Sequence, residues 1–128
     1  MTKTVLDIGN CNPDHSSLSR MLVTNFNVRV LRAHDLKDSL ELLQKEPVDL
    51  ILINRKLDID YSDGLEILQH FKQDDQLKGI PAMIITNYPE HQEEAVAAGA
   101  EYGFGKLQFA DMATQDRLSR FLDKKGAV

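Results

Sequence analysis

Short apolar runs alternate with helix-like patterns along the whole chain. Between the runs, apolar residues recur at intervals of three and four positions, which predicts amphipathic helices. The runs themselves predict strands at Thr4–Ile8, Val28–Ala33, Val48–Ile53, Pro81–Thr86 and Glu101–Gly105. The third and fourth runs are almost continuously apolar, as expected of strands that are buried on both faces of a parallel sheet. The pattern therefore predicts a succession of five strand–helix units.

Capping residues mark the ends of the expected helices. Asn12 followed by Pro13 predicts an N-cap and a first helical position. Asp35 and Asp63 are placed to cap the second and third helices. The last two helices are expected over Pro89–Ala98 and Ala110–Leu122.

The order of the elements determines the expected topology. Strands that are separated by single helices must run parallel, because only a crossover returns the chain in the same direction. Right-handed crossovers then give a doubly wound, five-stranded parallel sheet, a flavodoxin-like α/β fold with strand order 2-1-3-4-5. A chain of 128 residues fits a single domain, and residues 123–128 are expected to form a frayed tail.

Composition and charge narrow the classes of function. The net charge of -5 argues against nucleic-acid binding, which usually needs a basic surface. The single cysteine, Cys11, rules out an internal disulfide and a cysteine metal cluster. No apolar run approaches the ~18 residues that span a bilayer, and the N-terminus lacks the apolar core of a secretory signal. A cytoplasmic protein that binds neither membrane nor nucleic acid is expected.

In a doubly wound sheet, the functional crevice lies beyond the carboxyl ends of the strands. That rule selects the segments Gly9–Cys11, His34–Asp35, Asn54–Asp58, Thr86–Asn87 and Lys106–Leu107. The chain contains neither a glycine-rich phosphate loop nor a nucleophile elbow, so we do not expect an enzyme. The histidines have no metal-ligand spacing and are expected at the surface: His15, His34, His70 and His91.

These segments resemble the receiver domain of two-component response regulators, over nearly the whole chain. PVDLILIN is similar to the third strand of that family, DGLEIL to the start of its third helix, IPAMIIT to its fourth strand and GAEYGFGK to its fifth. The resemblance implies a signalling domain. In such a domain carboxylates hold Mg²⁺, an aspartate at the end of the third strand accepts a phosphoryl group, and a hydroxyl and a lysine bind that group.

The sequence departs from this family pattern at its reactive positions. By resemblance, Asn54 stands at the phospho-acceptor position, and Gly9 and Asn10 stand at the acidic pair. None of the three is a carboxylate, so we expect no metal, no cofactor and no aspartyl phosphorylation. Thr86 and Lys106 match the hydroxyl and the lysine. They either still face a phosphate or remain only as a strand-end cap and a solvated charge.

The residues around the fifth strand differ from the family as well. Gly103 stands where the resemblance places a switching aromatic residue, with Tyr102 and Phe104 on either side. The two rings either pack the strand or, for Tyr102, offer a contact to a partner. Leu107 stands where the family has a proline. We expect a trans bond before it, because a cis bond there would cost about 3 kcal/mol.

Two features of the crevice leave alternatives open. The loop from Asn54 to Asp63 carries three aspartates and is expected to be solvated rather than to bind a cation. Asp7 lies in a strand expected to be buried, where an unpaired charge is expensive. Since Lys106 has lost its usual carboxylate partners, we expect it to pair with Asp7 or with Asp58.

The leading functional prediction is a pseudo-receiver that binds other proteins without aspartyl phosphorylation. By resemblance, its docking face comprises the fourth helix, the fifth strand and the fifth helix, which is also a candidate homodimer interface. The candidate residues on this face are Glu90, Glu94, Tyr102, Phe104 and Arg117. One alternative is a small-ligand or anion sensor that uses Lys106, Thr86 and Arg55. A second is an active receiver with a displaced acceptor such as Asp58.

Overall fold

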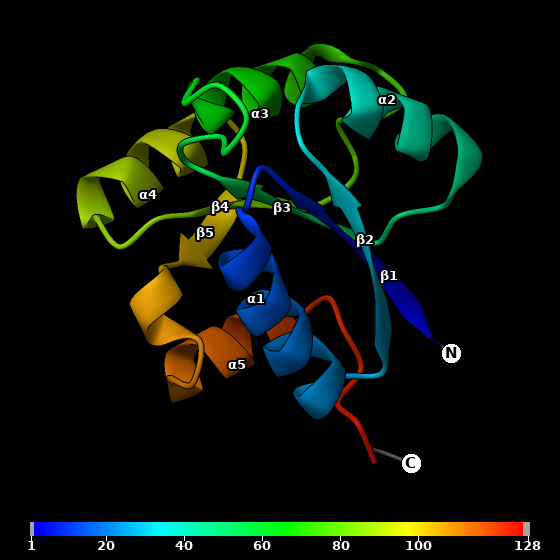
Figure 1. Ribbon diagram of the computed structural model, residues 1–128, viewed down its shortest axis with the longest axis vertical. Coiled ribbons are helices and arrows are strands. Elements are labelled where there is room, and N and C mark those ends of the chain that lie inside the picture. Colours follow the sequence, from blue (N-terminus) through cyan, green and yellow to red (C-terminus); the bar gives the residue numbers. More distant parts are fainter. Residues whose placement is uncertain (1, 127–128) are drawn as a thin grey trace.

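Five parallel strands form one sheet in the order β2-β1-β3-β4-β5 in the computed structural model, which describes residues 2–126 (Figure 1). The strands are β1 (Lys3–Ile8), β2 (Val28–Ala33), β3 (Leu50–Asn54), β4 (Ala82–Ile85) and β5 (Glu101–Phe104). The expected doubly wound fold and its strand order are confirmed.

Helices cover both faces of the sheet (Figure 1). One face carries α1 (Asn12–Asn25) and α5 (Met112–Ser119). The other carries α2 (Leu36–Lys45), α3 (Gly64–Gln73) and α4 (Pro89–Ala97). A short 3₁₀ turn, Lys106–Gln108, follows β5. No helix among residues 2–126 combines the length and the apolar character needed to cross a membrane.

The central strand β3 shows why its sequence is apolar throughout. Leu50 and Leu52 pack under α1 and α5, whereas Ile51 and Ile53 pack under the helices of the opposite face. All four side chains are fully buried. Because successive side chains of a strand point to opposite faces, a strand covered on both sides needs an unbroken apolar run.

The first and the last helix differ most from their expected bounds. The N-cap of α1 is Cys11 rather than Asn12, and Pro13 occupies the second position of the helix. The last helix is shorter than expected at both ends, since it begins at Met112 and ends at Ser119. The caps at Asp35 and Asp63 are confirmed, since each side chain accepts a backbone hydrogen bond from the first turn of its helix.

The segment after α5 is attached to the chain between α1 and β2, so its expected fraying is wrong for residues 123–125. The Asn27 amide donates to the Asp123 carbonyl at 2.8 Å, and the Lys125 amide donates to the Asn25 carbonyl at 2.9 Å. Between them, Phe26 and Lys124 form an antiparallel bridge. Residues 127–128, the end of the expected frayed tail, lie outside the described residues.

Candidate functional site

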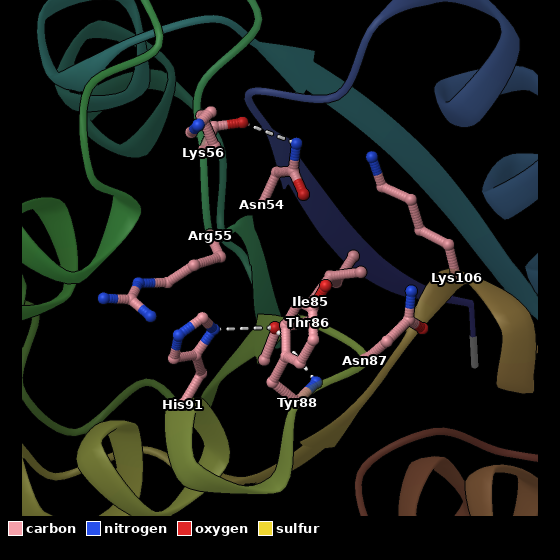
Figure 2. A pocket seen from close by; sticks show the side chains of 9 residues that line it. All are labelled: Asn54, Arg55, Lys56, Ile85, Thr86, Asn87, Tyr88, His91 and Lys106. Carbon is pink, nitrogen blue, oxygen red and sulfur yellow. Dashed lines mark hydrogen bonds between the residues drawn. The ribbon is translucent and has the colours of Figure 1, made fainter.

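A cavity of about 310 Å³ opens at the carboxyl ends of β3, β4 and β5 (Figure 2). It brings together Asn54, Thr86 and Lys106, which the sequence placed at the ends of three separate strands. The complete lining is Asn54, Arg55, Lys56, Ile85, Thr86, Asn87, Tyr88, His91 and Lys106. Tyr88 and His91 were not expected in this cavity. They reach it because α4 begins directly above the end of β4.

Asn54 is held by hydrogen bonds that its side-chain amide donates and that a carboxylate could not. Its Nδ2 atom donates to the Lys56 carbonyl at 2.6 Å and to the Gly9 carbonyl at 3.3 Å (Figure 2 shows the first). A carboxylate at this position would place a negative oxygen against these two carbonyl oxygens. The local backbone therefore suits asparagine and disfavours aspartate.

The positions of the expected acidic pair do not fit a magnesium ion. Gly9 has a φ of +82°, and a Cβ atom there would lie 2.4 Å from Leu57 Cδ2. Asn10 is buried, and its Nδ2 atom donates to Asp7 Oδ1 at 2.5 Å. Mg²⁺ needs negatively charged oxygen ligands in near-octahedral geometry. Among the described residues no group of three or more histidine, cysteine or acidic side chains is arranged to hold a metal.

Lys106 pairs with a carboxylate that the sequence analysis did not select. Its Nζ atom donates to Asp14 Oδ2 at 2.5 Å, across the crevice on the first turn of α1. The expected pairing with Asp7 or Asp58 is wrong, because α1 brings Asp14 close to the end of β5. The Lys106 ammonium also holds the pKa of Asp14 below its ordinary value.

Asp7 is fully buried and pairs with a histidine instead. His15 Nδ1 lies 2.6 Å from Asp7 Oδ2. His15 therefore faces the sheet, and its expected position at the surface is wrong. Burial raises the pKa of Asp7, while the hydrogen bonds from His15 and Asn10 and the charge of Arg32 oppose this effect. The ionised carboxylate is thus tolerated only because several donors surround it.

Thr86 is bonded to the first turn of α4. Its Oγ1 atom lies 3.2 Å from His91 Nδ1 and accepts a hydrogen bond from the Tyr88 amide at 3.3 Å (Figure 2). His91 therefore lines the cavity, contrary to its expected surface position. No cis peptide bond occurs among the described residues, so the expected trans bond before Leu107 is confirmed.

The loop after β3 is closed by its own hydrogen bonds. The Arg55 guanidinium donates to both carboxylate oxygens of Asp63, from Nε at 2.8 Å and from Nη2 at 3.1 Å. This contact holds the pKa of Asp63 below its ordinary value. Asp60 accepts hydrogen bonds from the amide and the hydroxyl of Ser62. The positive charge of Arg55 is thus partly neutralised beside the cavity.

The fourth helix and the fifth strand are joined through Gln92, a residue that the sequence analysis missed. Its side chain is buried and bonds both β4 and β5. A single glutamine among the polar residues of α4 does not create a periodic pattern in the sequence. Only the position of Gln92 in the fold therefore reveals this role.

The outer face of α4, β5 and α5 presents most of the expected contact residues. Tyr102 is 41% exposed, and the Arg117 guanidinium carbon lies 4.6 Å from the centre of its ring. Glu90 and Glu94 are exposed on α4. Phe104 is fully buried against Phe109, so its expected place on this surface is wrong.

Comparison with known proteins gives a consistent family match. The model of the response regulator receiver domain matches residues 12–118. No curated protein sequence matches the chain.

Solved structures with the same fold cover nearly the whole chain at low sequence identity. The Mn²⁺-bound form of response regulator Rcp1 is 20% identical with a TM-score of 0.72, covering 98% of this chain and 97% of its own. Chemotaxis protein CheY4 of Vibrio cholerae is 20% identical with a TM-score of 0.69, over 94% of this chain and 95% of its own. The receiver domain of Francisella response regulator 1452 is 18% identical with a TM-score of 0.72, over 93% and 98%.

Proposed function

Because the chain belongs to the response regulator receiver domain family, we propose that it is a pseudo-receiver, which signals by binding proteins and not through aspartyl phosphate. The observation that carries this proposal is the Asn54 amide, which donates to two backbone carbonyls where a receiver needs a nucleophilic carboxylate. An amide nitrogen is not a nucleophile toward phosphorus. The crevice therefore lacks the first reactant of the family's chemistry.

The ion pairs of Lys106 and Arg55 support the same proposal. In phosphoryl transfer, basic side chains stabilise the negative charge of the transferred group. Here Lys106 is bound to Asp14 and Arg55 to Asp63. Both cations already have carboxylate partners from within the chain, so neither needs a phosphoryl group to balance its charge.

The direct test is incubation with acetyl phosphate and Mg²⁺, followed by intact-protein mass spectrometry. We expect no added phosphoryl group, while a receiver with an intact acceptor aspartate, run in parallel, gains one. A mass increase that disappears in Asp58→Ala would contradict the proposal and favour the displaced acceptor. Asp58 is the variant to use, because its Oδ1 atom is buried without a hydrogen-bond partner.

We assign partner binding to the face that carries Tyr102, Arg117, Glu90 and Glu94, and a second copy of the chain is one candidate partner. Stacking of Arg117 over Tyr102 holds the ring in place before any partner arrives. Ordered tyrosine and arginine side chains are frequent among the residues that dominate interface energetics.

Sedimentation velocity over a range of concentrations tests the homodimer. If this face joins two copies, Tyr102→Ala weakens association by roughly tenfold or more. Tyr61→Ala is the matched control, because Tyr61 is also exposed but lies in the loop between β3 and α3. Equal association of the two variants would exclude this face as the dimer interface.

Binding of a small anion in the cavity is the second candidate function. The lining contains three cationic residues, Arg55, Lys56 and Lys106, and no acidic one, in a chain whose net charge is -5. Thermal denaturation with phosphate compounds and nucleotides tests it. Saturable stabilisation that is lost in Lys106→Gln but kept in Lys45→Gln, an exposed lysine of α2, would support this function.

A further inference from the structure

The side chain of Gln92, on α4, makes hydrogen bonds to the neighbouring strands β4 and β5. Its side chain is 3% exposed. The Nε2 atom donates to the Ile84 carbonyl at 2.9 Å and to the Thr86 carbonyl at 3.3 Å, both from the β4 side. The Gly103 amide of β5 donates to Oε1 at 2.7 Å. Both hydrogens of the buried amide and its oxygen therefore have partners.

An irregularity in the sheet explains why this amide is needed. Met83 pairs with Glu101, and Ile85 pairs with Phe104, so the register shifts between these pairs. One residue of β4 thus lies opposite two of β5, as in a β-bulge. The Ile84 carbonyl and the Gly103 amide both lie at this irregularity, and buried backbone groups without partners are costly. The Gln92 side chain bonds both groups and completes the ladder.

Gly103 and Gln92 depend on each other. A Cβ atom at position 103 would lie 2.4 Å from the Ile84 carbonyl oxygen and 3.2 Å from Gln92 Oε1. A side chain at this position would therefore displace the amide or open the strands. The absence of an aromatic residue at 103 and the presence of Gln92 are two parts of one arrangement.

We propose that Gln92 is a positioning residue that fastens α4 to the bulge of β5 and keeps the α4–β5 face in one conformation, whatever the crevice contains. The role of this attachment in signalling rests on the proposed function of the docking face. Its test measures the motion of α4 in the protein alone, so a failure of the docking proposal would leave the result unchanged.

Hydrogen-exchange protection factors of α4 and β5 amides test the fastening. Gln92→Met keeps the length of the side chain but loses all three hydrogen bonds, so protection of α4 and of the Gly103 amide should fall by about tenfold or more. Gln69→Met is the matched control, because Gln69 is exposed on α3. Wild-type protection in the Gln92→Met variant would overturn the proposal.

Gln92→Glu provides a readout that general loss of packing would not give. A carboxylate accepts from the Gly103 amide but cannot donate to the two carbonyls, whereas the protonated acid donates one hydrogen bond. Protection of α4 in this variant should be low near neutral pH and recover as the pH falls through the pKa of the glutamate. The wild type and Gln69→Met should show no such recovery. A pH-independent Gln92→Glu variant would refute the role of the amide even if Gln92→Met failed to fold.

The wild-type protein tests whether the conformation of α4 and β5 is independent of what the crevice contains. Acetyl phosphate with Mg²⁺, and separately inorganic phosphate, should leave the amide chemical shifts of β5 and of α4 beyond His91 unchanged. Tyr88 and His91 line the cavity, so shifts confined to them report only direct contact. Shifts that spread from Thr86 to Tyr102 on addition of either compound would show that α4 moves with the crevice, and would overturn this part of the proposal.

Discussion

Individual side chains determine the chemistry of the crevice through the hydrogen bonds that they make. Asn54 donates to two carbonyls, Asn10 donates to Asp7, and Lys106 donates to Asp14. Under the proposed correspondence with receiver domains, each contact uses a side chain at a position that would face a metal or a phosphoryl group. Restoring one family residue therefore changes an existing hydrogen-bond pattern rather than filling an empty place.

Asn54→Asp tests whether the acceptor alone is missing. We expect no phosphoryl gain by mass spectrometry with acetyl phosphate and Mg²⁺, because Gly9 and Asn10 still supply no carboxylate. The variant should also lose about 1–3 kcal/mol of unfolding free energy in urea, because its carboxylate faces two carbonyl oxygens. Asn87→Asp is the control, since the Asn87 contact uses its oxygen to accept from the Leu107 amide. A phosphorylated, fully stable Asn54→Asp protein would contradict this prediction.

Asp7→Asn should change how stability depends on pH. Burial raises the pKa of Asp7, so the folded protein binds this proton more tightly than the unfolded chain does. The wild type therefore loses stability as the pH rises from the ordinary aspartate pKa through the raised one. Relative to the wild type, Asp7→Asn should gain unfolding free energy across that interval, measured by urea denaturation at a series of pH values.

Asp14→Asn is the control of opposite sign. Lys106 lowers the pKa of Asp14, so this carboxylate stabilises the fold above the ordinary aspartate pKa, and the contribution is lost as the pH falls through the lowered value. Asp14→Asn should thus be less stable than the wild type near neutral pH and approach it in acid. Parallel pH profiles for the two variants would show that the buried pair is assigned incorrectly.

At the scale of elements, the start of α3 connects the crevice to the sheet. The Asp63 side chain accepts from the Leu65 amide at 2.9 Å and also binds Arg55. Gly64 follows because the helix passes close to β3, where a Cβ atom would lie 2.2 Å from the Asn54 carbonyl oxygen. The cap, the ion pair and the glycine together fix the helix against the strand that carries Asn54.

Two substitutions separate the cap from the ion pair. Asp63→Asn keeps a capping oxygen and should cost on the order of 0.5 kcal/mol of unfolding free energy. Asp63→Ala loses both contacts and should cost about 1–2 kcal/mol. Because Arg55 lowers the pKa of Asp63, the effect of Asp63→Asn should vanish as the pH falls through that lowered value. Urea denaturation, with exposed Asp116→Asn as control, measures these differences, and equal costs for the two variants would show that the cap contributes nothing.

At the scale of the whole molecule, residues 123–125 lie against the connection between α1 and β2. This part of the chain follows α5 and pairs with the end of the first helix (Figure 1), so we expect it to stabilise that helix. Leu122 is buried in the same apolar cluster as Leu18 and Leu22 of α1. The C-terminal segment is thus part of the folded unit.

Truncation measures this contribution. A chain that ends at Leu122 loses the hydrogen bonds made by Asp123 and Lys125 and should lose about 1–2 kcal/mol of unfolding free energy in urea. A chain that ends at Lys125 keeps both bonds and should match the full-length protein. If the two truncations are equally stable, the segment does not stabilise α1.

The sequence by itself determined the fold, the strand order and the convergence of Asn54, Thr86 and Lys106. Apolar periodicity and the ends of parallel strands are local signals, and the crossover rule converts them into one topology. The caps at Asp35 and Asp63 were equally readable, because a cap involves residues only two or three positions apart.

Only the tertiary structure decided which side chains meet in the crevice. Lys106 and Asp14 are separated by 92 positions, and Gln92 and Gly103 by 11, so no periodic pattern links them. The bulge in β5 also breaks the alternation of faces, which is why Gly103 and Phe104 are both buried and Phe104 was misplaced. Pairing of this kind depends on the packing of whole helices against the sheet, because that packing sets the direction and distance of each side chain.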